Sequence, residues 1–321
     1  MNGNTSPLSL LLDINFDSTS DFDCFANAMS GREICNWRVN KNIDRSSVKY
    51  AVVWKPDLGL LASLPNLEVI FSAGAGVDHI FEDTKLPKNI PIVRFVDPDL
   101  RDRMSEWVVL QCLMHLRQQR SYDRNQRQHS WQELAQPIAS EVRVGVMGLG
   151  ELGKDAALKL KMMGFRVSGW SRSKKNIKNI PTFAGDNDFN EFLCQSDIIV
   201  NLLPLTNKTT GILGRDLIEK LPQNGAIKPV IINAGRGGSQ IEADIIKALQ
   251  KGILGGVSLD VFEQEPLSES SALWDIENAI LTPHVAAVSS MPALASYVAQ
   301  RIEIFEANGS LTNLVDTKSG Y

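Results

Sequence analysis

The chain has 321 residues, 43% of them hydrophobic, which is enough to bury more than one core, so two domains are expected. The net charge of −4 gives no general attraction to nucleic acids or anionic membranes, and small-molecule partners are expected instead. The four cysteines are scattered without a C-x-x-C pair, so buried, reduced thiols are expected and a metal site is not. No apolar run is long enough to span a membrane, and the expected location is the cytoplasm.

The first part of the chain alternates strand-like apolar runs with helix-compatible segments, which is the pattern of parallel βαβ units. The run at residues 8–12 is short, lacks a basic flank and meets Asp13, which fits a strand better than a signal peptide. Strands are predicted over residues 8–14, 50–54, 67–73 and 92–95. Residues 101–127 contain no Pro or Gly and predict a long helix suited to bridging two domains.

A second set of strand-like runs is long enough for a complete Rossmann-like sheet. It covers residues 142–147, 166–170, 197–203, 230–234, 257–261 and 279–281. A last helix, predicted over residues 292–307 and stopped by Asn308 and Gly309, should pack on the first domain. We therefore predict an α/β fold of two Rossmann-like domains with doubly wound parallel sheets. A nucleotide-binding domain, residues 102–286, is inserted into a discontinuous substrate-binding domain, residues 1–101 and 287–321.

A G-x-G-x-x-G segment follows the first strand of this second set and precedes a predicted helix, which is the context of a dinucleotide site. Gly148 would allow the tight turn, Gly150 the close approach of a pyrophosphate, and Gly153 close packing of helix and strand. Glu151 and Leu152 are counted with Gly148 and Gly150 as cofactor-binding residues. The Glu151 carboxylate would repel a pyrophosphate unless it points to solvent, and a glycine turn without a ligand is the alternative interpretation.

The end of the next strand predicts which dinucleotide is bound. An NAD site usually carries Asp or Glu there, about 20 residues after the first glycines, whereas this chain has Ser171, Arg172 and Ser173, followed by further lysines. A 2′-phosphate suits an Arg fork and hydroxyl groups, so NADPH should bind better than NADH. A merely solvated basic loop remains the alternative.

Three separated residues have the chemistry of a hydride-transfer site. Arg236, Glu265 and His284 each follow a short apolar run. Reduction of a 2-oxo acid needs a proton donor and a cation that holds the carboxylate and polarises the carbonyl; His284 and Arg236 would supply these, with Glu265 orienting the imidazole. Taken singly, each has another interpretation: a surface salt bridge for Arg236, the start of a helix for Glu265, and a turn for His284.

Several motifs together make the chain resemble the D-isomer-specific 2-hydroxyacid dehydrogenase family over nearly its full length, and most closely its glyoxylate/hydroxypyruvate reductase branch. They are V-W-K-P at 53–56, A-G-A-G-V-D at 73–78, W-S-R-S at 170–173, N-L-L-P at 201–204 and T-P-H-V-A-A at 282–287. The resemblance implies that Arg236, Glu265 and His284 are catalytic and that Asp260 contacts the nicotinamide carboxamide.

The resemblance also implies roles for residues whose types alone do not indicate one. Substrate-binding residues would be Trp54, which limits the pocket, and Ala75 and Gly76 in a carboxylate-binding loop, together with Arg236. Cofactor contacts would include Leu203, Pro204, Thr209 and Ala234. A dimerisation arm is implied around residues 102–140, where residues 117–131 carry four arginines and Trp131, so a homodimer is expected in place of a merely solvated helix face.

The implied function is NADPH-dependent reduction of small 2-oxo acids, glyoxylate to glycolate and hydroxypyruvate to D-glycerate, with weaker use of NADH and closure of the substrate domain before hydride transfer. Two alternatives stay open. One is a dinucleotide-sensing binding protein of the same fold, like the family's corepressors, and the other is a D-2-hydroxyacid dehydrogenase with a larger substrate. The Gly-Gly-Ser-Gln run at 237–240 departs from the β-branched or aliphatic residues that relatives more often carry after R-G.

Overall fold

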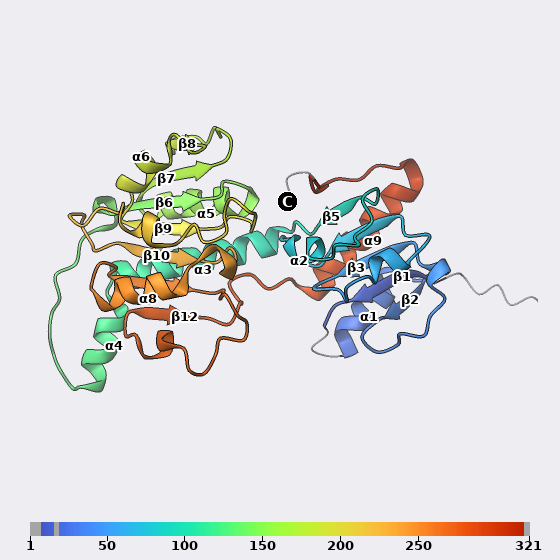
Figure 1. Cartoon of the computed structure of the whole chain (residues 1–321), viewed down its shortest axis with the longest axis horizontal. Coiled ribbons are helices and arrows are strands. Elements are labelled where there is room, and N and C mark those ends of the chain that lie inside the picture. The colour runs from blue at the N-terminus through green and yellow to red at the C-terminus, as the bar shows by residue number, and fades with distance from the viewer. Residues whose placement is uncertain (1–7, 16–18, 318–321) are drawn as a thin grey trace, which may run out of the picture. The chain divides into compact units, whose positions relative to one another are not determined.

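The computed structural model describes residues 8–15 and 19–317. The chain divides into two compact units, Met1–Leu100 with Ser289–Tyr321, and Arg101–Val288. The boundary predicted between residues 101 and 102 lies one residue from the first division, and the boundary predicted between residues 286 and 287 lies two residues from the second. Each unit is an α/β structure built on a parallel sheet, so the predicted fold class is confirmed (Figure 1).

The first unit contains a five-stranded parallel sheet with the strand order β2-β1-β3-β4-β5. Its strands are β1 (Leu8–Asp13), β2 (Glu33–Asn36), β3 (Tyr50–Val53), β4 (Val69–Ser72) and β5 (Ile92–Arg94). Every residue of β3 and β4 is buried, as expected for strands that are covered on both faces. This order is the flavodoxin-like version of the doubly wound sheet.

Helices cover both faces of this sheet. On one face, α1 (Thr19–Ala28) packs against α9 (Met291–Asn308), and the Tyr50 ring of β3 meets Phe305 of α9 edge to face. On the other face, Ile80 of α2 (Asp78–Phe81) shares a buried cluster with strand residues. Helix α9 ends as predicted, because Gly309 takes the left-handed conformation (φ 73°) and donates its N–H to Phe305 O.

The second unit contains a seven-stranded parallel sheet with the order β12-β11-β10-β9-β6-β7-β8. Its strands are β6 (Arg143–Met147), β7 (Arg166–Ser171), β8 (Thr182–Ala184), β9 (Ile198–Asn201), β10 (Val230–Asn233), β11 (Gly256–Leu259) and β12 (Ala279–Leu281). The strand order reverses between β6 and β9, and ligands of such sheets bind beyond the carboxyl ends of the strands at this switch point.

Two buried clusters hold helices to opposite faces of this second sheet. One joins β6 and β9 to α3 (Pro98–Leu116) and α5 (Glu151–Met162). The other joins alternate residues of the same strands to α6 (Phe189–Cys194), α7 (Arg215–Ile218) and α8 (Glu242–Gln250). The alternation follows from the two-residue period of a strand, which sends successive side chains to opposite faces.

The long helix predicted over residues 101–127 is interrupted. Gln118 has left-handed backbone angles (φ 53°, ψ 40°) and separates α3 from α4 (Gln119–Arg127). Arg120 donates to the main-chain oxygen of Glu277, and Arg124 pairs with the Glu277 carboxylate at 2.8 Å. Two of the four arginines in residues 117–131 therefore tie α4 to its own unit and are not simply solvated.

Two strands were not predicted from the sequence. Strands β2 and β8 have four and three residues and lie at sheet edges, next to a single neighbouring strand each. Cysteine burial was also only partly as expected, because Cys35 and Cys112 are buried but Cys194 is exposed. Among the described residues, no helix is long and apolar enough to cross a membrane.

Candidate active site

The glycine-rich turn lies at the switch point of the second sheet. A Cβ on Gly148, which has φ 97°, would lie 2.8 Å from Leu202 O, and one on Gly153 would lie 1.8 Å from Gly148 O, so both positions require glycine. A Cβ on Gly150 would meet no atom of the described chain within 4 Å. The backbone at the start of α5 thus borders open space, which fits an approaching pyrophosphate.

The helix start also accounts for Glu151. It is the first residue of α5 and is exposed, so its carboxylate can point to solvent. A negative charge in the first turn of a helix is favourable because it faces the positive end of the helix dipole. Leu152 follows half-buried. An exposed position at the helix start therefore lets the Glu151 carboxylate avoid a bound phosphate.

The predicted 2′-phosphate loop begins where β7 ends. Ser171 is buried and its hydroxyl donates to Ser173 O at 2.8 Å, while Arg172 and Ser173 are exposed. The Lys174 ammonium donates to Thr182 O of β8, which ties the loop to the neighbouring strand. The loop therefore presents one arginine and one serine at the carboxyl end of the strand beside the glycine turn, which suits a phosphate.

The loops after β9 and β10 contain the other predicted cofactor residues. Leu203 and Ala234 are buried, and Pro204 is half-buried. The Thr209 hydroxyl donates to Pro204 O at 2.7 Å and accepts from the Thr206 N–H at 2.8 Å. Thr209 therefore orders its own loop, and its contact with a cofactor stays a prediction.

Arg236 lies in a loop after β10 that is held by a network of hydrogen bonds. The buried Asn233 side chain accepts from the Gly235 N–H and donates both to Arg236 O and to Gln240 Oε1. Asn201 of β9 in turn donates to Asn233 Oδ1 at 2.9 Å. This network fixes the backbone on both sides of Arg236, whose half-buried guanidinium donates to Gly235 O.

The Arg236 loop abuts the loop after β11 that carries Glu265. A Cβ on Gly237 would lie 1.8 Å from Phe262 O, and one on Gly238 would lie 3.0 Å from the Leu205 side chain. Gly237 therefore permits a contact with the Phe262 backbone that any larger residue would prevent.

His284 and Glu265 form a direct pair. The imidazole Nδ1 lies 3.1 Å and 3.0 Å from the two Glu265 carboxylate oxygens, with the side chains 35% and 25% exposed. A carboxylate at Nδ1 accepts a hydrogen bond there and leaves Nε2 as the second ring nitrogen. Arg236, Glu265 and His284 follow β10, β11 and β12, three adjacent parallel strands, so they share one edge of the sheet.

Trp54 and the 73–77 loop belong to the first unit. The centroids of the Trp54 ring and the buried His79 ring are 4.4 Å apart. The indole also lies so close over Gly74 that a Cβ on Gly74 would be 2.7 Å from the nearest indole carbon. The Ser72 hydroxyl donates to Gly76 O at 2.7 Å. Within the described part of the chain, the Ala75 and Gly76 N–H groups have no hydrogen-bond acceptor, which is the property of an anion-binding loop.

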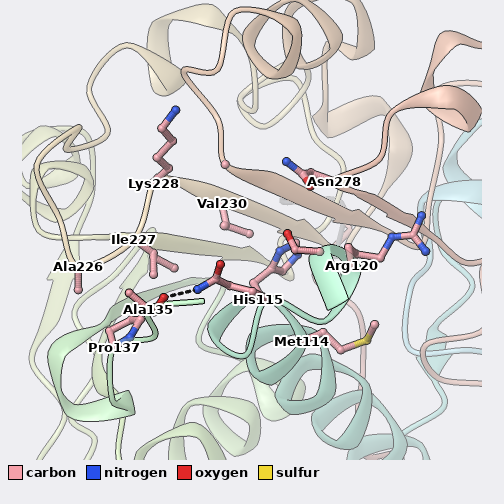
Figure 2. Close-up of a pocket in the computed structure, with 13 residues that line it drawn as sticks. Met114, His115, Arg120, Ala135, Pro137, Ala226, Ile227, Lys228, Val230 and Asn278 are labelled. Carbon is pink, nitrogen blue, oxygen red and sulfur yellow. Dashed lines mark hydrogen bonds between the residues drawn. The ribbon is translucent and has the colours of Figure 1, made fainter. Parts of the chain in front are cut away.

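A cavity of about 320 Å³ lies at the other edge of the second sheet (Figure 2). Val230, which begins β10, and Gly255 and Asn278, which precede β11 and β12, help to line it. His115 lies in its wall and contacts Ser258 Oγ at 2.9 Å. Because that hydroxyl donates to Gln111, His115 Nε2 is the donor. The cavity contains none of the predicted catalytic residues.

His115 should make the folded state sensitive to acid. Burial lowers its pKa from 6.5 to about 4, so the unfolded chain takes up the proton first and the free energy of unfolding falls as pH drops through this range. His115→Gln should reduce that loss by up to about 3 kcal/mol. Urea denaturation across the range, with exposed His129→Gln as the control, checks this. Equal losses in wild type and His115→Gln would contradict it.

Several residues that support the predicted site were not predicted from the sequence to do so. His79 contacts Trp54, and Ser72 holds the 73–77 loop. Asn201, Asn233 and Gln240 form the network under Arg236. The positions of the two asparagines, each at the carboxyl end of a buried strand, were the available signal, because a polar residue there is directed toward the ligand edge of the sheet.

Comparison with known proteins decides the family. Residues 109–286 match the model of the D-isomer specific 2-hydroxyacid dehydrogenase, NAD binding domain. The chain belongs to this family. It is 35% identical over 283 residues to glyoxylate/hydroxypyruvate reductase A of Yersinia enterocolitica, covering 87% of this chain and 89% of that protein.

Solved structures of the family are similar over the whole chain. The NADPH-dependent glyoxylate/hydroxypyruvate reductase of Sinorhizobium meliloti, in complex with NADP and sulfate, is 47% identical with a TM-score of 0.93, covering 98% of this chain and 100% of that one. A probable 2-hydroxyacid dehydrogenase of Rhizobium etli, in complex with NADP, HEPES and L(+)-tartaric acid, is 51% identical with a TM-score of 0.92, covering 98% and 99%.

Proposed function

We propose that this member of the D-isomer specific 2-hydroxyacid dehydrogenase family is an NADPH-dependent reductase of small 2-oxo acids, with glyoxylate and hydroxypyruvate as substrates and glycolate and D-glycerate as products. The observation that carries the proposal is the His284–Glu265 pair at 3.0 Å, on the same sheet edge as Arg236 and the glycine turn. The reductases of Yersinia and Sinorhizobium support the choice of substrates.

The chemistry divides among the residues as follows. The dinucleotide, when bound, supplies the hydride that adds to C2 of the 2-oxo acid. The Arg236 guanidinium holds the substrate carboxylate and polarises the carbonyl, because its planar fork matches two oxygens. His284 gives a proton from Nε2 to the carbonyl oxygen, and Glu265 holds Nδ1 and so fixes the ring orientation. The Ala75 and Gly76 N–H groups offer further donors to a carboxylate.

A substrate panel tests this function. In a panel of glyoxylate, hydroxypyruvate, pyruvate and phenylpyruvate, oxidation of NADPH should be slowest with phenylpyruvate, because Trp54, whose indole lies over Gly74, is proposed to limit the size of the pocket. Turnover of phenylpyruvate above both small acids would indicate a dehydrogenase with a larger substrate. Binding of NADPH without turnover of any 2-oxo acid would favour a dinucleotide-sensing protein.

Arg172→Ala should raise the KM for NADPH by about tenfold to a hundredfold, since charge-assisted hydrogen bonds contribute about 1.5–3 kcal/mol. The KM for NADH, which has no 2′-phosphate, should change by less than about twofold. Arg172 is exposed at the end of β7, where the 2′-phosphate is proposed to bind. Steady-state kinetics with both cofactors measures the effect. Arg166→Ala, at the exposed amino end of the same strand, is a matched control. Equal changes with NADPH and NADH would contradict the assignment.

A homodimer through the 117–131 segment is also proposed. Trp131 is 104% exposed, and a fully exposed tryptophan is unusual outside an interface. Trp131→Ala should weaken dimerisation by about 30-fold or more, as expected for an aromatic interface anchor, measured by analytical ultracentrifugation. Trp274→Ala, at a second exposed tryptophan held by Ser268 O, is the control and should leave the dimer intact. A wild-type monomer, or equal effects of both variants, would contradict the proposal.

A further inference from the structure

The side chain of Asp260 is bound by residues on both sides of His284. Its Oδ1 accepts from the Thr282 hydroxyl at 2.5 Å and from the Val285 N–H at 2.9 Å, and its Oδ2 accepts from the Ala286 N–H at 2.9 Å. Asp260 is 1% exposed. A carboxylate offers about four acceptor sites, so three of them are occupied by one short segment of the chain.

The main chain of Asp260 holds the same segment. Its carbonyl oxygen accepts from the His284 N–H at 2.8 Å, and its own N–H donates to Asn233 O at 3.0 Å. A single buried residue after β11 therefore contacts the backbone or side chain of Thr282, His284, Val285 and Ala286. This links the turn that carries His284 to the end of β10.

The turn needs such support because His284 has an unfavourable backbone conformation. Its φ is 57°, in the left-handed region, which costs a residue with a side chain about 1–2 kcal/mol. Without the Asp260 contacts the segment would relax toward ordinary angles. That change would rotate the imidazole away from Glu265, since the direction of a side chain follows its backbone.

We infer that Asp260 is a positioning residue: its carboxylate fixes the 282–286 turn in the strained conformation that holds His284 Nδ1 against Glu265 and leaves Nε2 for the substrate carbonyl. The inference rests on the proposed role of His284 as proton donor. It gives Asp260 a function within the protein itself, beyond the cofactor contact that family resemblance implies. Glu265 would hold the ring and Asp260 the backbone.

The cleanest test removes one of the three donors and leaves Asp260 in place. Thr282→Val deletes the hydroxyl at nearly constant volume and should lower kcat about tenfold to a hundredfold, the range expected when a catalytic group is displaced by about 1 Å. The KM for NADPH should change by less than about twofold. Thr282→Ser keeps the hydroxyl and should restore most of kcat. Asp260→Asn places an NH₂ group opposite one of the three donors and should also lower kcat.

A double-mutant cycle separates this inference from the proposed function. In a His284→Ala background, Thr282→Val should cause no further loss of kcat, because the hydroxyl would act only through the imidazole. A second loss of tenfold or more there, or a Thr282→Val enzyme with normal kcat, would overturn the positioning role while the proton-donor role stands. A raised KM for NADPH with unchanged kcat in Asp260→Asn would assign Asp260 to cofactor binding instead. Normal turnover in His284→Ala alone would overturn the proposed function first.

Discussion

Replacing His284 with alanine should lower kcat for glyoxylate reduction by about 10²- to 10⁴-fold, the usual contribution of a positioned general acid. The imidazole is the proposed proton source, and its Nδ1 is held by both oxygens of Glu265. Binding of NADPH should be unchanged, because the glycine turn and the Arg172 loop lie beyond other strands of the sheet. Steady-state kinetics together with fluorescence titration of NADPH measures the two quantities.

Two further variants make this result specific to His284. His129→Ala removes an exposed histidine at the end of α4 and should leave kcat unchanged. Glu265→Gln keeps an oxygen acceptor for Nδ1 but loses the charge, so its kcat should lie between those of wild type and His284→Ala. A His284→Ala enzyme with at least a tenth of the wild-type kcat would exclude the imidazole as the proton donor.

Arg236→Lys should lower kcat/KM by about 10²- to 10³-fold, comparable to the loss of one strong donor to a developing oxyanion. Lysine keeps the positive charge but cannot contact two oxygens with a planar fork. The Asn233 network holds the backbone of this loop, so the substitution should change the contact and not the fold. The measurement is kcat/KM for glyoxylate and hydroxypyruvate with NADPH saturating.

The matched control for that substitution is Arg215→Lys. Arg215 begins α7 and lies 3.7 Å from Asp244, with its side chain 59% exposed. Its replacement should leave kcat/KM within about twofold, as expected for an exposed pair. Near-normal kcat/KM in Arg236→Lys would show that the substrate is held by charge alone or by other groups.

The sequence predicted those parts of the structure that have a local physical signal. Continuous apolar runs predicted the central strands, because both faces of a parallel sheet are buried. Glycine spacing predicted the nucleotide turn, and the end of α9 followed from Gly309. The edge strands β2 and β8 were missed, since each has few apolar residues and pairs with one neighbour.

The parts that could not be predicted depend on contacts between residues distant in sequence. No Pro or Gly near Gln118 marks the residue at which the helix breaks, and the tie between α4 and Glu277 joins residues about 150 positions apart. The link between Asp260 and Thr282 is similar, because it requires β11 and β12 to be neighbours in register. The reactive groups could therefore be predicted from the sequence, whereas the residues that hold them in place became evident only from the order of the strands in the sheet.

Transfer of a labelled hydride from NADPH to hydroxypyruvate is the direct test of the proposed reduction. NADPH carrying deuterium at the transferable position of the nicotinamide is incubated with hydroxypyruvate, and the product is examined by NMR and by chiral chromatography. The expected product is glycerate of the D configuration with deuterium at C2, formed in equal amount to the NADPH oxidised. Absence of NADPH oxidation, glycerate without deuterium at C2, or an L product would contradict it.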